Sequence, residues 1–207
     1  MTSVSPAGAI PPRQARSRAA LERLLSAAQE VLVTRGFDEF TIAAVAEKAG
    51  VSVGGVYRRF TGKDQLLETV LDRALDDLQS TVSAALATPT PDLAGAVSAF
   101  AGALADYLGR TGPLYTAALT ASRRPDKRDR ALAVLTGLQR VFFDAALPHA
   151  AEITHPAPST ALNTALRTII GAGVHRAATA PLWPDGLGWE QWASEMAEMA
   201  TGYLTRS

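Results

Sequence analysis

Apolar residues in this chain recur at intervals of three and four, which is the spacing that lines one face of an α-helix. The clearest stripe, from about residue 17 to 35, consists of Leu21, Leu24, Leu25, Ala28, Val31 and Leu32. Gly36 follows it, at the place where a glycine commonly ends a helix. Because the strict alternation typical of half-buried strands is nearly absent, the sequence predicts an all-α fold.

The stretch "TIAAVAEKAGVSVGGVYRRF" at 41–60 predicts two short helices joined by a tight turn. Thr41 is a good N-cap for the first helix and Ser52 for the second, while Gly50 can take the positive φ that the turn requires. Val56 and Phe60, four residues apart, would hold the inner face of the second helix to the core. This is the plan of a helix-turn-helix, in which the second helix enters the major groove of DNA.

A longer helix is predicted from "TGKDQLL", where Thr61 and Asp64 have the spacing of a capping box, to about Leu86. Further helices, separated by segments that carry Pro or Gly, are predicted at about 92–110, 113–123, 126–147, 158–179 and 189–205. We therefore expect a disordered tail at 1–12, a DNA-binding domain at 13–62, a linking helix at 63–87 and a second helical domain at 88–207.

Composition excludes several classes of function. With no cysteine there is no disulfide framework, thiol nucleophile or thiolate metal site. The three histidines lack the i, i+4 spacing of a helical zinc site, and the chain has neither a glycine-rich phosphate loop nor a Gly-x-Ser-x-Gly elbow. We therefore expect no enzyme activity, no cofactor and no metal. No run approaches the roughly 18 uncharged apolar residues that span a bilayer, and the N-terminus lacks signal-peptide features, so we expect a soluble cytoplasmic protein without a membrane partner.

Charge is balanced over the whole chain but not along it. Twenty basic and twenty acidic residues give no formal net charge, whereas the segment from Arg13 to Lys63 holds nine Lys and Arg against five acids. A local positive face on a neutral protein is compatible with one small module that binds phosphates. The arginines at 13, 16 and 18 fit either an arm that reaches toward the DNA or an ordinary solvated helix start.

Residues 41–70, "TIAAVAEKAGVSVGGVYRRFTGKDQLLETV", resemble the DNA-binding domain of the TetR family of bacterial transcriptional regulators, and "AALERLLSAAQEVLVTRGFDEF" is similar to that family's first helix. The resemblance covers roughly residues 16–72, about a quarter of the chain. It implies a three-helix helix-turn-helix domain, joined by a long helix to a C-terminal helical domain for ligand binding and dimerisation.

The resemblance also implies the residues that contact DNA. Thr41, Tyr57 and Lys63 would contact phosphates. Bases or nearby backbone would be reached from Ser52, Val53, Gly55 and Arg58. Gly54 matches the family pattern, in which a small residue lets the backbone come close to DNA. Gly55 departs from it, and we hypothesise that specificity depends more on Arg58, Arg59 and DNA shape than is typical.

Two helices of the second half carry apolar residues at heptad-like spacing. They are Leu162, Leu166, Ile169 and Gly173 in one helix and Trp189, Trp192, Met196, Met199 and Tyr203 in the other. Two such helices from each chain would form the four-helix bundle of a homodimer, as the resemblance implies. The alternative is that this stripe faces the core of its own chain.

Effector candidates are the aromatic residues and histidines of the middle helices, although such residues at helical spacing are more often core. These are Tyr107, Tyr115, Phe142, Phe143, His149, His175 and Trp183. The low charge of these helices favours a mostly apolar ligand. We therefore expect a homodimeric regulator, a repressor released from a palindromic double-stranded operator by a small apolar effector. The alternative is a helix-turn-helix module for DNA or protein binding without an effector, yet about 115 residues of further helix exceed what DNA docking needs.

Overall fold

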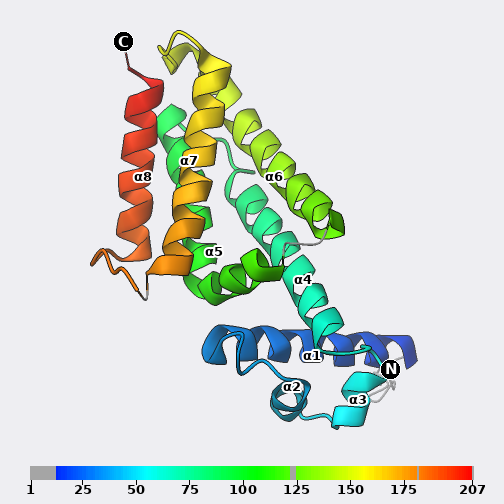
Figure 1. Ribbon diagram of the computed structural model, residues 1–207. Helices are drawn as coiled ribbons and strands as arrows, with labels where there is room; N and C mark the ends of the chain where they lie inside the picture. Colours follow the sequence, from blue (N-terminus) through cyan, green and yellow to red (C-terminus); the bar gives the residue numbers. More distant parts are fainter. Residues whose placement is uncertain (1–12, 122–124, 181, 207) are drawn as a thin grey trace, which may run out of the picture. The chain divides into compact units, whose positions relative to one another are not determined.

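The computed structural model describes residues 13–121, 125–180 and 182–206, so the predicted tail at 1–12 lies outside the described residues. Within these ranges the elements are α1 (Arg13–Arg35), α2 (Ile42–Ala49), α3 (Val53–Tyr57), α4 (Lys63–Ala85), α5 (Leu93–Ala121), α6 (Pro125–Ala146), the 3-10 helix η1 (Leu147–Glu152), α7 (Pro158–Thr179) and α8 (Trp189–Leu204) (Figure 1). No strand occurs in the described ranges, which confirms the all-α prediction. The chain divides into two compact units between Val70 and Leu71, inside the predicted linking helix 63–87.

The first unit is built on the apolar stripe of α1. Leu24, Ala28, Val31 and Leu32 are buried, and α1 packs against α2. Gly36 ends α1 with a φ of +78°, and its N–H donates to the carbonyl of Leu32 at 3.1 Å. A residue with a Cβ is strained at this φ, so the glycine cap predicted at 36 is confirmed.

The start of α4 differs from the prediction of a box between Thr61 and Asp64. Since the first helical residue is Lys63, the side chain that reaches back to Thr61 is that of Gln65 and not that of Asp64. Its Oε1 accepts from the Thr61 N–H at 2.6 Å and from the Thr61 hydroxyl at 3.1 Å. The box was wrong by one residue because it assumed that the helix starts just after Thr61.

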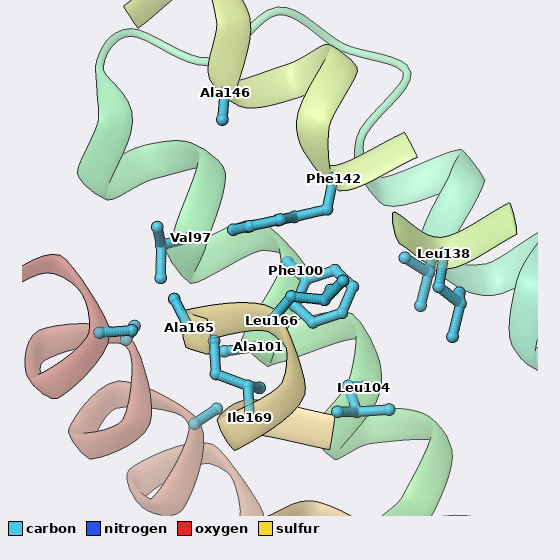
Figure 2. Packing of buried hydrophobic residues seen from close by; sticks show 14 of the residues in the cluster. Val97, Phe100, Ala101, Leu104, Leu138, Phe142, Ala146, Ala165, Leu166 and Ile169 are labelled. Carbon is cyan, nitrogen blue, oxygen red and sulfur yellow. The ribbon is translucent and has the colours of Figure 1, made fainter. Parts of the chain in front are cut away.

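The second unit has a core centred on α5, which packs against α6, α7, α8 and η1. Figure 2 shows Phe100 of α5 beside Phe142 of α6, with Leu166 and Ile169 of α7 close by. The two phenyl rings are tilted by 54° with their centroids 5.0 Å apart, a favourable aromatic geometry. All four side chains are buried, so this cluster accounts for the association of α5, α6 and α7.

Helix α5 runs unbroken from Leu93 to Ala121, whereas the sequence predicts two helices divided by "RTGP". The prediction rested on Pro113, since an interior proline loses one hydrogen bond and costs about 3 kcal/mol. The backbone at Gly112, however, lies against α7, where an added Cβ would be 3.5 Å from the carbonyl oxygen of Ala177. This contact supports α5 next to the proline, and the helix bends instead of ending (Figure 1).

Polar side chains stabilise two loop regions of the second unit, one before α5 and one between α7 and α8. The Glu152 carboxylate accepts from the Leu93 N–H at 3.1 Å, and so caps α5 from η1. Arg176 donates to both carboxylate oxygens of Asp185, at 2.8 and 2.9 Å, and lies over the ring of Trp189. The hydrogen bonds from Arg176 are the main cause that lowers the pKa of Asp185 to about 2.

One segment, Asp129–Glu152, reaches the length and mean hydropathy of a membrane-spanning helix, although charged residues interrupt its apolar run. Its Val134, Leu138 and Phe142 recur every four residues and are buried in the core of the second unit. Arg140, between Leu138 and Phe142, and Asp144, after Phe142, are exposed. This pattern is that of an amphipathic helix packed in a core.

Candidate nucleic-acid interface

Helices α2 and α3 meet at Gly50, which takes the predicted left-handed conformation with φ +66° and ψ +35°. Its N–H points to the carbonyls of Ala46 and Glu47, and the Val51 N–H donates to Ala46 at 3.0 Å. These bonds satisfy the end of α2 and turn the chain into α3. The predicted turn is therefore confirmed in its backbone geometry.

Val56 and Phe60 are buried, as predicted, and attach one side of α3 to the core of the first unit. The opposite side faces solvent, with 44% of Val53 and 56% of Tyr57 exposed. The other exposed positions of this segment are Ser52, Gly54, Arg58 and Arg59, and Gly55 is half-buried. Almost every DNA-contact residue predicted in this segment is therefore accessible on a short anchored helix.

Two hydroxyl groups predicted to touch DNA also cap helices. Thr41 Oγ1 accepts from the Ala44 N–H at 3.1 Å, and Ser52 Oγ accepts from the Gly55 N–H at 3.1 Å. Each bond uses the hydroxyl as an acceptor, so each O–H can still be donated to a phosphate oxygen. The caps therefore hold both donors in place at the first turns of α2 and α3.

Lys63 is positioned by residues that the sequence analysis did not select. Its ammonium lies 3.4 Å from the carbonyl oxygen of Phe37 and 4.6 Å from the centre of the Phe37 ring, with the Phe40 ring at 5.9 Å. These contacts favour a fixed cation at the N-terminus of α4, where the helix dipole also attracts anions. Phe37 lies 26 residues before Lys63, so no local pattern could have indicated the pairing.

The predicted effector residues are dispersed over the second unit. Tyr107 and Phe142 are buried, and the Tyr107 hydroxyl donates to the carbonyl of Ala74. Phe143 is half-buried, whereas Trp183 is 75% exposed. The ring of Trp183 is edge-on to the ring of His175, with their centroids 6.4 Å apart. The side chain of Tyr115 lies outside the described residues. These positions do not converge on one site.

His149 lines an open cleft of about 400 Å³ between the end of α4 and the end of α6. The other lining residues are Ser83, Leu86, Ala87, Thr88, Pro89, Thr90, Val141, Asp144, Ala145 and Pro148. The two ring nitrogens of His149 lie 3.2 Å from Thr90 Oγ1 and 3.3 Å from Glu152 Oε1. The imidazole is thus held by its neighbours at the wall of a mostly apolar cleft.

The apolar positions predicted for a dimer seam lie largely inside one chain. Leu162, Leu166, Ile169 and Trp192 are buried in the core of the second unit. A Cβ on Gly173 would lie 2.8 Å from Leu108, so this glycine permits contact between α7 and α5. Trp189, Met196 and Tyr203 are half-buried, and Met199 is exposed. The alternative of an intrachain core therefore describes most of this stripe.

Among the described residues, no group of three or more His, Asp or Glu could hold a metal ion. The chemistry that the exposed side of α3 offers is therefore that of hydroxyls, a phenol and guanidinium groups, all of which bind phosphate or base edges.

Residues 24–70 match the model of the bacterial regulatory proteins of the tetR family. The HTH-type transcriptional activator FasR of Mycolicibacterium smegmatis is 42% identical over 81 residues, which are 38% of this chain and 37% of that protein. The chain thus matches well under half the length of this relative.

Two solved structures share the fold over most of the chain. The TetR-family regulator PfmR of Thermus thermophilus superposes with a TM-score of 0.64 at 19% identity, over 86% of this chain and 97% of that one. The regulator FadR of Bacillus subtilis, solved with stearoyl-CoA, superposes with a TM-score of 0.62 at 17% identity, over 88% and 98%. Residues 24–70 therefore carry the domain of the tetR family of bacterial regulatory proteins, and the chain shares its fold with solved regulators such as PfmR.

Proposed function

We propose that this protein is a transcriptional regulator that binds operator DNA through α3. The observation that carries the proposal is the exposed side of α3, which presents Val53, Tyr57 and Arg58 while Val56 and Phe60 anchor the helix from behind. A recognition helix needs this arrangement, because its outer side chains must reach base edges while its inner side stays packed. Thr41, Tyr57 and Lys63 would bind the flanking phosphates. The protein would act in the cytoplasm.

The regulator would be a homodimer on a palindromic operator, because two recognition helices about one helical turn apart read two half-sites. Since the apolar stripe of α7 and α8 is largely used inside the chain, the dimer would form through the outward faces of these helices. Arg167 is exposed on α7, and Glu195 and Glu198 are exposed on α8. In a two-fold bundle, α7 of one protomer lies beside α8 of the other, so these opposite charges would pair.

Sedimentation at micromolar protein tests this interface. The wild-type protein should sediment as a dimer, and the E195K/E198K variant should shift toward monomer through repulsion with Arg167. Adding R167E to that variant should restore the dimer, because the charges are opposite again. A monomeric wild-type protein would contradict the dimer, and unaffected dimerisation of E195K/E198K would contradict this arrangement.

The second unit would bind a small, mostly apolar effector that releases a repressor from DNA. Supporting features are the apolar character of its helices and a shared fold with FadR, which was solved with stearoyl-CoA. The effector would bias the position of α4, which begins in the first unit and continues into the second. A coupling free energy of about 1 to 3 kcal/mol would weaken operator binding roughly 5- to 150-fold.

Selection of DNA from a random pool by the full-length protein, followed by affinity measurement, tests the proposal. The wild-type protein should enrich a palindromic motif, and Y57A should lose most of the affinity while the control R140A, on the exposed face of α6, keeps it. Stearoyl-CoA is the first effector probe, followed by free fatty acids and uncharged apolar compounds. Enrichment of no motif would refute DNA recognition. A probe that binds the protein tightly without changing operator affinity would instead favour a module that lacks effector control.

A further inference from the structure

The two adjacent arginines at the end of α3 have different surroundings. Arg58 is the C-cap of α3 and lies one turn after Gly55. A Cβ placed on Gly55 would be 3.5 Å from Arg58 Nη2 and 3.3 Å from Ser52 Oγ. The guanidinium of Arg58 therefore lies over the bare backbone at position 55, in the space that a side chain there would share.

Arg59 points instead toward α1. Its Nη2 donates to the hydroxyl oxygen of Ser17 at 3.3 Å, and Figure 1 shows the N-terminal end of α1 beside α3. Within the described part of the chain, Arg58 has no hydrogen bond or ion pair of this kind. Arg58 is therefore available to a ligand, whereas Arg59 is engaged by its own chain.

The contact between Arg59 and Ser17 brings further positively charged side chains to the edge of the first unit. Arg16 and Arg18 flank Ser17, both are exposed, and the first turn of α1 carries no acidic residue. Holding this turn against the end of α3 places their cations beside the recognition helix. Such a cluster suits phosphates, which attract cations without regard to sequence.

We infer that Arg58 determines base specificity from the space left by Gly55, while Arg59 is a positioning residue that holds the arginines of α1 on the DNA backbone. The inference rests on the proposed operator binding and assigns the reading to one of the two arginines. A guanidinium at the end of the recognition helix can donate two hydrogen bonds to O6 and N7 of guanine, and we expect each half-site to contain such a guanine.

Four variants of the full-length protein test the inference: R58A, G55A, R59A and S17A. Binding is measured to the motif that the wild type enriches and to the same motif with its guanine replaced. R58A should lower the preference for guanine by roughly 5- to 150-fold per half-site. G55A should weaken the same preference, because its methyl group would occupy the space beside the Arg58 guanidinium, in contact with Nη2, and would press on the Ser52 hydroxyl at 3.3 Å. R58A/G55A should be no less specific than R58A alone.

R59A and S17A should behave differently. Both should weaken binding to all sequences alike and reduce the salt dependence of the affinity, whose logarithmic slope falls by about 0.9 for each lost phosphate contact. The motif itself should stay unchanged. Thermal unfolding of each variant shows whether the first unit remains folded.

Three results would overturn the inference: an altered base preference in R59A, an unaltered one in R58A, or independent, additive losses from G55A and R58A. In each case the wild type still enriches a motif, so DNA recognition itself stands. A folded wild-type protein that enriches no motif would refute the proposed function and this inference with it.

Discussion

Replacing Gly54 with alanine should make the protein more stable and a poorer DNA binder at the same time. Gly54 is the second residue of α3, it is exposed, and its φ is not positive. A Cβ built there meets no atom within 4 Å. Nothing inside the chain therefore requires a glycine at this position, and its function is expected to involve something outside the chain.

The two effects can be estimated separately. Alanine in place of a helical glycine stabilises by about 0.5 to 1 kcal/mol, and the lower value applies in a first turn. Where the α3 backbone lies directly against DNA, an added methyl group acts like overpacking, which costs about 1 to 3 kcal/mol at each contact. The expected loss of affinity is roughly 5- to 150-fold for each half-site.

Urea unfolding and fluorescence anisotropy with a labelled operator measure the two quantities. The matched control is G102A in α5, since a Cβ on Gly102 also meets nothing within 4 Å and lies in the second unit. That control should gain stability and keep full affinity. If G54A binds the operator as tightly as the wild type, close approach of α3 to DNA is not the reason for this glycine.

Three further changes probe other parts of the molecule. K63A should weaken DNA binding and reduce the slope of log affinity against log salt concentration by about 0.9 for each protomer. A salt titration of the operator affinity measures this slope, and an unchanged slope would show that Lys63 contacts no phosphate. D185N should lower the urea midpoint at neutral pH, because it breaks the pair with Arg176. Since that pair lowers the pKa of Asp185 from 3.8 to about 2, the stabilisation is complete above about pH 4 and is lost as the pH falls toward 2. The urea midpoints of the wild type and D185N should therefore converge as the pH falls from about 4 to about 2. A constant difference between them would contradict this assignment. G173A should destabilise the protein by about 1 to 3 kcal/mol, because its Cβ would lie 2.8 Å from Leu108 and 3.0 Å from Trp192. In urea unfolding, the midpoint of G173A should fall below that of G102A. An unchanged stability would mean that these two side chains can move aside.

Features set by neighbouring residues could be predicted from the sequence. Gly36 and Gly50 each follow an apolar helical stripe, and the left-handed φ that such a position favours was found at both. The partners of Lys63 and Arg59 could not be predicted, because Phe37 and Ser17 lie 26 and 42 residues away. Those contacts depend on how the helices pack.

The apolar stripe of α7 and α8 shows a second feature that apolar spacing in the sequence cannot predict. Its spacing correctly indicates which faces avoid water, and Leu166, Ile169 and Trp192 are indeed buried. Periodicity does not indicate whether the covering surface belongs to the same chain or to another one. The continuity of α5 through Pro113 has the same origin, because the contact with Ala177 that supports it lies on a later helix.

The cap that Glu152 places on Leu93 also bears on how the chain folds as it is synthesised. The acceptor follows the donor by 59 residues, so at about 5 to 20 residues per second the start of α5 waits roughly 3 to 12 seconds for it. The helices that cover α5, namely α6, α7 and α8, also emerge later. The first unit, by contrast, is complete once Val70 has left the ribosome. A nascent chain stalled before α8 should therefore carry a folded DNA-binding unit and an uncovered apolar helix, which is the form on which we expect chaperones to act.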